Sequence, residues 1–157
     1  MVKIEMENGG VITLELSPEA APITVANFEK LVGEGFYNGL TFHRVIAGFM
    51  IQGGDPLGNG MGGSDEKIKG EFAANGVANP ISHKRGVISM ARAQNPNSAS
   101  SQFFIMHADG EFLDGQYAAF GHVTSGIEVV DAIAEVDTDM RDKPLKPQVI
   151  KSITIEK

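Results

Sequence analysis

The chain has 157 residues, a length that favours one compact domain, and its 42% of apolar residues excludes a disordered chain. The 13 Lys and Arg residues against 20 Asp and Glu residues leave a net charge of -7, which removes the main attraction for the phosphate backbone of a nucleic acid. Cysteine is absent, which excludes disulfides, thiolate nucleophiles and zinc–thiolate sites.

The N-terminal residues alternate polar and apolar side chains and lack the apolar core of a signal peptide. No stretch reaches the roughly 18 uninterrupted apolar residues of a membrane-spanning helix. We therefore expect a single domain over residues 1–157 that acts in the cytoplasm as a monomer, without nucleic-acid or membrane partners.

The first predicted element is a β-hairpin. Residues Val2–Glu7 and Val11–Leu16 alternate in polarity, and Asn8-Gly9-Gly10 between them is typical of a tight turn. Six further short runs are strand-like, and eight short strands in a chain of this length indicate a mostly β barrel or sandwich. These runs are Leu40–Ile46, Phe49–Gln52, Gly86–Ala91, Gln102–Met106, Ala118–Val123 and Val149–Ile155.

Two segments have the period of an amphipathic helix instead. The first runs from Pro22 to Val32, and Gly33 is the expected C-terminal stop. The second follows Ser125, which together with Glu128 has the spacing of a capping box. Each helix is short and has one apolar face, so we expect both to pack against the sheet.

Two long stretches lack periodicity and are candidates for functional loops, namely residues 53–86 and 93–101. The glycine run at residues 58–63 formally matches a dinucleotide-binding pattern, but no helix is predicted after it to hold a pyrophosphate. The four histidines lack the close spacing of metal ligands, so we expect neither a metal nor another cofactor.

Arg44 is the most informative single residue, because it lies among apolar neighbours in a predicted strand. Strand alternation places it on one face with Phe42 and Ile46. A buried Arg is costly unless it is anchored, whereas an exposed Arg on an edge strand is the commoner arrangement. The strand alone leaves both interpretations open.

Two longer motifs favour the functional interpretation: Phe-His-Arg-Val-Ile-x-Gly-Phe-Met-x-Gln-Gly-Gly-Asp at residues 42–55, and Ser-Gln-Phe-Phe-Ile at residues 101–105. In these motifs the chain resembles the cyclophilin family of peptidyl-prolyl isomerases, in particular a short bacterial-type member. The resemblance runs from the first hairpin to the last strand. It implies a closed eight-stranded antiparallel β-barrel with two capping α-helices, and a substrate groove outside the barrel.

The resemblance also implies a role for each matching residue. Arg44 is expected to be catalytic. The expected pocket for the proline ring consists of Phe49, Met50, Phe104 and Leu113. The expected partners of the substrate backbone and the groove lining are Gln52, Gln102, Gly60, Ala91, Arg92, Ala93, Phe112 and Tyr117.

Two positions depart from common family patterns. Phe112 stands where many members have Trp, so an indole N–H donor is lost and we expect weaker binding of cyclosporin-type inhibitors. Tyr117 stands where many eukaryotic members have His, and its phenol can still donate a hydrogen bond. Neither change affects Arg44 or the expected proline pocket.

The implied activity is cis–trans isomerisation of X-Pro bonds in proline-containing peptides and in unfolded or folding proteins. The alternative is a proline-peptide binding module or folding helper whose catalysis is incidental. A ligand-binding barrel of the lipocalin type is a third possibility, but the two predicted helices argue against its open interior.

Overall fold

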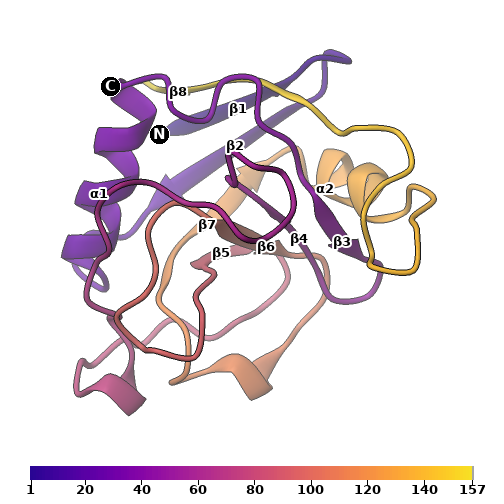
Figure 1. The fold of residues 1–157 in the computed structure, drawn as a ribbon. Helices are drawn as coiled ribbons and strands as arrows, with labels where there is room; N and C mark the ends of the chain where they lie inside the picture. The colour runs from indigo at the N-terminus through magenta and orange to yellow at the C-terminus, as the bar shows by residue number, and fades with distance from the viewer. Residues whose placement is uncertain (157) are drawn as a thin grey trace.

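The computed structural model describes residues 1–156 and is mostly β structure (Figure 1). The strands are β1 (Val2–Met6), β2 (Val11–Leu16), β3 (Arg44–Ile46), β4 (Met50–Gly53), β5 (Val87–Met90), β6 (Phe103–Met106), β7 (Ala119–Ser125) and β8 (Ile150–Ile155). The helices are α1 (Pro22–Gly33) and α2 (Ile127–Ala134), with short 3-10 turns at Ala73–Asn75 and Glu111–Leu113. Each predicted strand and helix overlaps one of these elements. No helix in residues 1–156 is long and apolar enough to cross a bilayer.

All eight strands belong to one antiparallel sheet in the order β3-β4-β6-β5-β7-β2-β1-β8. The N-terminal hairpin is confirmed: β1 pairs with β2, and the turn is fastened by a 2.8 Å bond from the Met6 N–H to the Gly10 carbonyl. The sheet curls, and the two helices lie on opposite sides of it (Figure 1).

The expected closed barrel is wrong, because the sheet remains open between β3 and β8. Only residues 44–46 of the predicted strand Leu40–Ile46 form a ladder, and they pair with β4. The preceding residues cross to the other edge, where Thr41 and Val149 form an isolated bridge. A few backbone hydrogen bonds therefore join the two edges where a full ladder was expected, and the fold is a curled half-barrel.

The inner face of the sheet is apolar. Strand register aligns Val45, Ile51, Ile105 and Ile88 across β3, β4, β6 and β5, and all four are buried. Aromatic rings complete the core beneath α1, where Phe28 packs against Tyr37, Phe103 and Phe120 at centroid distances of 5.3, 5.7 and 5.2 Å.

The predicted common face of Phe42, Arg44 and Ile46 is only partly correct. Strand β3 begins at Arg44, so the alternation does not extend back to Phe42. The Phe42 ring is fully buried in the inner core, 5.9 Å from the centroid of Phe103, whereas Arg44 and Ile46 are half-buried on the outer face.

Helix α1 ends one residue later than predicted. Gly33 is its last helical residue, and Gly35 adopts the left-handed conformation with φ of 70°. The reversal after the helix is fastened by 3.0 Å bonds from the Gly35 N–H to the Val32 carbonyl and from the Phe36 N–H to the Leu31 carbonyl. Gly35, rather than Gly33, is therefore the stop signal.

The predicted capping box at Ser125 and Glu128 is wrong. Strand β7 extends through Ser125, and the residue before α2 is Gly126, with φ of 88° and no side-chain cap. A Cβ atom at Gly126 would lie 2.1 Å from the Val11 carbonyl oxygen, so the close approach of this turn to β2 requires glycine.

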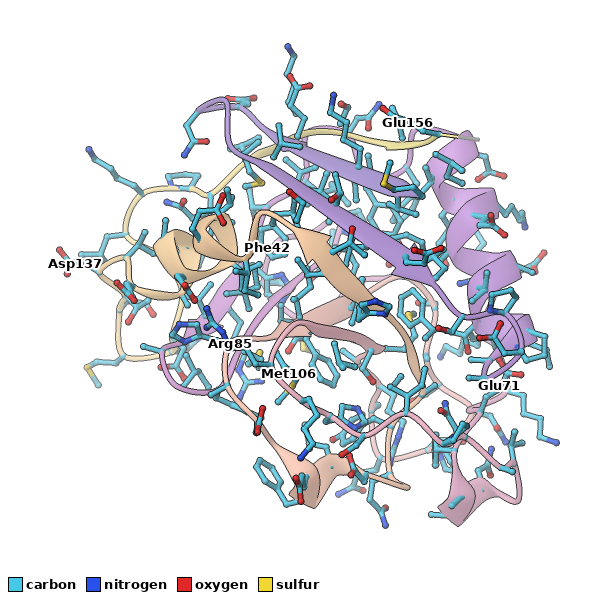
Figure 2. The ribbon with its side chains drawn as sticks, turned by 180° about the vertical axis from the view of Figure 1, so that it is seen from behind. Phe42, Glu71, Arg85, Met106, Asp137 and Glu156 are labelled. Carbon is cyan, nitrogen blue, oxygen red and sulfur yellow. The ribbon has the colours of Figure 1, made fainter. Side chains whose placement is uncertain are left out.

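The first turn of α1 is capped from a distant part of the chain. The residue before the helix is Ala21, which has no side-chain oxygen to accept a backbone hydrogen bond. Glu71 supplies it instead: its Oε1 accepts the Thr24 N–H at 2.7 Å and the Thr24 hydroxyl at 2.8 Å (Figure 2). Glu71 is buried, and its two hydrogen bonds fasten the loop after β4 to the helix.

We predict that Glu71→Ala lowers the free energy of unfolding by about 2 kcal/mol, the usual effect of losing hydrogen bonds to a buried charged group. Urea unfolding monitored by circular dichroism measures the change. The matched control is Glu66→Ala, which removes only an exposed pair with Lys30 and should change stability by less than about 0.5 kcal/mol. Equal effects of the two variants would contradict the capping role.

Candidate active site

The outer face of the sheet carries a second aligned row, which contains Arg44. Across β3, β4, β6 and β5 this row consists of Arg44, Gln52, Phe104 and Ser89. Directly opposite residues of an antiparallel pair face the same side, so the guanidinium, the Gln52 amide and the Phe104 ring share one surface.

Arg44 is anchored without an opposite charge. Its Nη1 donates to Gln52 Oε1 at 3.2 Å, and the Gln52 Nε2 donates in turn to Gln102 Oε1 at 2.9 Å. Among the described residues no carboxylate forms an ion pair with Arg44. Its positive charge and its remaining N–H groups are therefore available to a ligand.

The chain of amides ends on the backbone of the loop after β4. Gln102 Nε2 donates to the carbonyl oxygens of Gly60 at 3.1 Å and Gly62 at 2.8 Å. An amide that donates at one end presents its oxygen at the other, so these two carbonyls orient Gln102 and, through it, Gln52. Arg44 is thus placed by contacts that begin in this loop.

A buried carboxylate, Asp55, holds the loop itself. Its Oδ1 accepts the Leu57 N–H at 2.8 Å, and its Oδ2 accepts the N–H groups of Asn59 at 3.1 Å and Gly60 at 2.6 Å. Burial alone would raise the pKa of Asp55, but the backbone N–H groups, including that of Gly62, outweigh it and keep this pKa below its usual value. The loop is therefore built around a carboxylate that stays charged at neutral pH.

Beside Arg44 the outer face is hollowed into a pocket of about 160 Å³. Six of its nine lining residues are apolar or aromatic, and the Phe104 ring meets Tyr117 edge-on at a centroid distance of 5.7 Å. The lining residues are Arg44, Phe49, Met50, Gln52, Ala91, Arg92, Phe104, Leu113 and Tyr117. A compact apolar ring fits this volume, and two cationic side chains, Arg44 and Arg92, are among the residues that line it.

A second hollow of about 310 Å³ adjoins the first, and the two share Gln52, Ala91 and Arg92. Together they form one groove. The predicted residues Gly60, Ala93 and Gln102 line the second hollow. Sequence reasoning missed its other lining residues, Met61, Gly62, Gly63, Ser64, Lys67, Ser98 and Ser100. The only signal for them was the unusual length of the loops at residues 53–86 and 93–101.

Arg92 lies between the two hollows but is already engaged. Its Nη2 donates to the Gln116 carbonyl at 2.7 Å, and its guanidinium lies 5.0 Å from the Phe72 ring centroid and 4.7 Å from that of Tyr117. Its Nε donates to the same carbonyl, and its Nη1 donates to the carbonyls of Ala93 and Gln94. Most of its N–H donors are therefore occupied, and Arg92 shapes the groove.

Phe112 is the one predicted site residue outside both hollows. Its side chain is 72% exposed and its ring lies 5.6 Å from that of Phe49. It therefore extends the apolar rim of the pocket.

Comparison with known proteins agrees with this geometry. A family model described as cyclophilin type peptidyl-prolyl cis-trans isomerase/CLD matches residues 1–155. The chain belongs to this family. Peptidyl-prolyl cis-trans isomerase B of Bacillus subtilis is 51% identical over 132 residues, which cover 84% of this chain and 89% of that protein. Peptidyl-prolyl cis-trans isomerase ppi1 of Schizosaccharomyces pombe is 42% identical over 158 residues, covering 99% of this chain and 100% of that protein.

A solved cyclophilin has the same fold. The crystal structure of a Cryptosporidium parvum cyclophilin-type isomerase, obtained in the presence of the dipeptide Ala-Pro, has a TM-score of 0.91 and 34% identity. The match covers 99% of this chain and 98% of the other. In the present cyclophilin the predicted residues, Phe112 apart, line one continuous groove.

We predict that Asp55→Asn lowers the free energy of unfolding at pH 7 by about 1.5–3 kcal/mol, because the loop N–H groups lose a charged acceptor. The pKa of Asp55 is depressed by folding, so its contribution is complete above the unfolded value of about 3.9 and is lost as pH falls through the folded value. Urea unfolding at pH 7 and pH 3 should therefore show a smaller difference between wild type and variant at pH 3. Asp65→Asn, an exposed control in the same loop, should have little effect at either pH. A difference that is independent of pH would contradict the role of the charge.

Proposed function

We propose that this cyclophilin accelerates cis–trans isomerisation of X-Pro bonds, with Arg44 as the catalytic residue and the adjoining apolar pocket as the site of the proline ring. The observation that carries the proposal is the position of Arg44. Its guanidinium stands at the edge of a pocket of about 160 Å³, held by Gln52 and free of any ion pair with the described carboxylates.

The reaction needs no bond to break. Rotation about a peptide bond meets a barrier of about 18–20 kcal/mol, because the nitrogen lone pair is delocalised into the carbonyl group. In the twisted state that delocalisation is lost and the nitrogen regains its lone pair. A protein therefore accelerates rotation by binding the twisted amide more tightly than either planar form.

Arg44 suits this task. An N–H of its guanidinium can donate to the prolyl nitrogen only when the lone pair is localised, so the bond forms in the twisted state alone. A thousandfold acceleration requires about 4 kcal/mol of such differential binding. One charge-assisted hydrogen bond in a largely apolar site, together with correct positioning, is of that order.

The remaining groove residues bind substrate. Phe49, Met50, Phe104 and Leu113 hold the proline ring while the acyl side rotates, and the Gln52 and Gln102 amides are placed to bond the peptide backbone. The Ala-Pro dipeptide used with the Cryptosporidium parvum relative supports proline-containing peptides as the substrate class. We extend the proposed substrates to unfolded and folding proteins. We also propose that cyclosporin-type inhibitors bind only weakly, because Phe112 has no indole N–H to donate.

We predict that Arg44→Ala lowers kcat for an Ala-Pro tetrapeptide by roughly 100-fold or more, while the Kd for the peptide changes by less than about threefold. Arg44→Lys should recover little activity, because an ammonium lacks the planar fork of N–H groups. NMR exchange spectroscopy measures the rate and a titration measures Kd. Arg141→Ala, which removes an exposed guanidinium in the loop after α2, is the matched control and should behave as wild type.

Equal losses of kcat and peptide affinity in Arg44→Ala would contradict a role confined to the twisted state. If wild type binds the peptide without accelerating exchange, the groove is a recognition site and the alternative of a proline-peptide binding module replaces the enzyme.

We predict that kcat is nearly constant from pH 6 to pH 8, because no step transfers a proton and an arginine is charged throughout this range. The two buried histidines near the groove do not change this expectation. Burial lowers the pKa of His43 and of His83, which favours the neutral form of both rings, and neither ring has a role in the proposed rotation. A bell-shaped profile in the same exchange assay would indicate acid–base chemistry instead.

A further inference from the structure

The apolar pocket is assembled from two separate segments. Phe104 lies on β6, whereas Leu113 lies in the 3-10 turn Glu111–Leu113 that follows it. A proline ring between them is held only if the two walls keep a fixed separation. A buried histidine that the isomerase mechanism does not use, His83, contacts both segments.

On one side His83 supports Phe104. Its ring is stacked on the Phe104 ring, with centroids 6.0 Å apart and an angle of 18° between the planes. Its Nε2 lies 2.9 Å from the Ser89 hydroxyl, and Ser89 is the residue directly opposite Phe104 in the pairing of β5 with β6. The His83 ring thus lies beneath the Phe104 wall and is bonded to the neighbouring strand.

On the other side His83 holds the turn that carries Leu113. Its backbone N–H donates to Asp114 Oδ1 at 2.7 Å, and its Nδ1 lies 2.9 Å from the same oxygen. Its carbonyl accepts the Gly110 N–H at 2.7 Å. Both ends of the turn, Gly110 and Asp114, are therefore fastened to one residue.

These contacts define the state of the ring. The Asp114 carboxylate only accepts hydrogen bonds, so Nδ1 carries the proton and Nε2 accepts the Ser89 hydroxyl. Burial lowers the pKa of His83, against an opposing effect of Asp114, and so favours the neutral ring. Burial would raise the pKa of Asp114, but hydrogen bonds from Ser82 and His83 outweigh it and lower this pKa. At neutral pH every polar atom of the His83 ring has a partner, and the ring has no free donor for a substrate.

We propose that His83 is a positioning residue that fixes the Leu113 wall of the proline pocket relative to the Phe104 wall. This inference rests on the proposed function, because only that function makes a proline ring the occupant of the pocket. Under this proposal, the affinity of the pocket for a proline-containing peptide depends on His83, a residue that does not contact the peptide.

The test uses two variants of the whole chain. His83→Phe keeps a ring beneath Phe104 but loses the bonds to Asp114 and Ser89. His83→Asn keeps a donor near the position of Nδ1, and with it the bond to Asp114, but loses the stacked ring. The matched control is His122→Asn, which alters an exposed histidine on β7.

The expected result is a separation of KM from kcat. The pocket walls hold the proline ring in both planar states and in the twisted one, so loosening them weakens binding in all states alike. We expect His83→Phe to raise KM and the peptide Kd roughly fivefold or more with kcat within about twofold of wild type, and His83→Asn to raise them less. A merely structural role would lower the folded fraction, and hence the apparent kcat, at unchanged KM.

Methyl NMR signals of Leu113 give a second readout that does not depend on catalysis. In His83→Phe they should shift or broaden, whereas in His122→Asn they should match wild type. Unchanged Leu113 signals together with unchanged peptide Kd overturn the proposal, and so does loss of folding in both His83 variants, since His83 would then support the whole fold. If wild type fails to accelerate exchange, the proposed function falls, while the Leu113 signals and the peptide Kd still test the positioning role.

Discussion

The placement of Arg44 depends on a directional chain of hydrogen bonds that starts from Asp55. The Asp55 carboxylate gathers backbone N–H groups and shapes a loop whose carbonyls at Gly60 and Gly62 then face Gln102. Because an amide has a donor end and an acceptor end, this contact orients Gln102, which orients Gln52, whose oxygen meets the guanidinium. Reversing either amide would set two donors or two acceptors against each other. The chain therefore restricts Arg44 to a narrow range of positions without neutralising it.

Because of the strand register, one face of the sheet packs against the core and the other lines the groove. Val45, Ile51 and Ile105 face the core, while the residues next to them in sequence, Arg44, Gln52 and Phe104, face the groove. The groove thus rests on a backbone that is fixed by core packing on its other side. Residues far from the groove in sequence then complete it, as His83 and Asp114 do for the pocket walls.

Local patterns predicted the elements well where short-range chemistry determines them. The Asn8-Gly9-Gly10 turn and the alternation on either side of it specified the first hairpin, and Pro22 marked the start of α1. The groove residues, in contrast, followed from the family resemblance, of which the motifs at residues 42–55 and 101–105 are the most specific part, because alternation alone could not distinguish a functional Arg44 from an exposed one.

What the sequence did not reveal depends on contacts between distant segments. Residues 40–43 have strand-like composition, but they cross between the sheet edges and leave the half-barrel open. The cap of α1 comes from Glu71, 47 residues away from Thr24. His83 carried no recognisable signal, since its role requires Asp114, 31 residues further along the chain. Such pairings have no periodicity and cannot be read from any short window.

The open sheet has a consequence for the way a peptide would bind under the proposed function. An unpaired strand edge can recruit extended peptides as additional strands and retain them in aggregates. Strand β3 forms one edge, but it has only three residues, and the Val45 N–H is already bonded to the Asp142 carbonyl at 2.8 Å. Strand β8 forms the other edge, where the N–H groups of Ile150 and Ile153 are bonded to the Leu40 carbonyl and to the Asn38 side chain. A bound peptide would thus meet the face of the sheet and few unpaired backbone groups at these two edges. Binding in the proposed groove would rely on side chains and a few amides, so the peptide could be released after each rotation without joining the sheet.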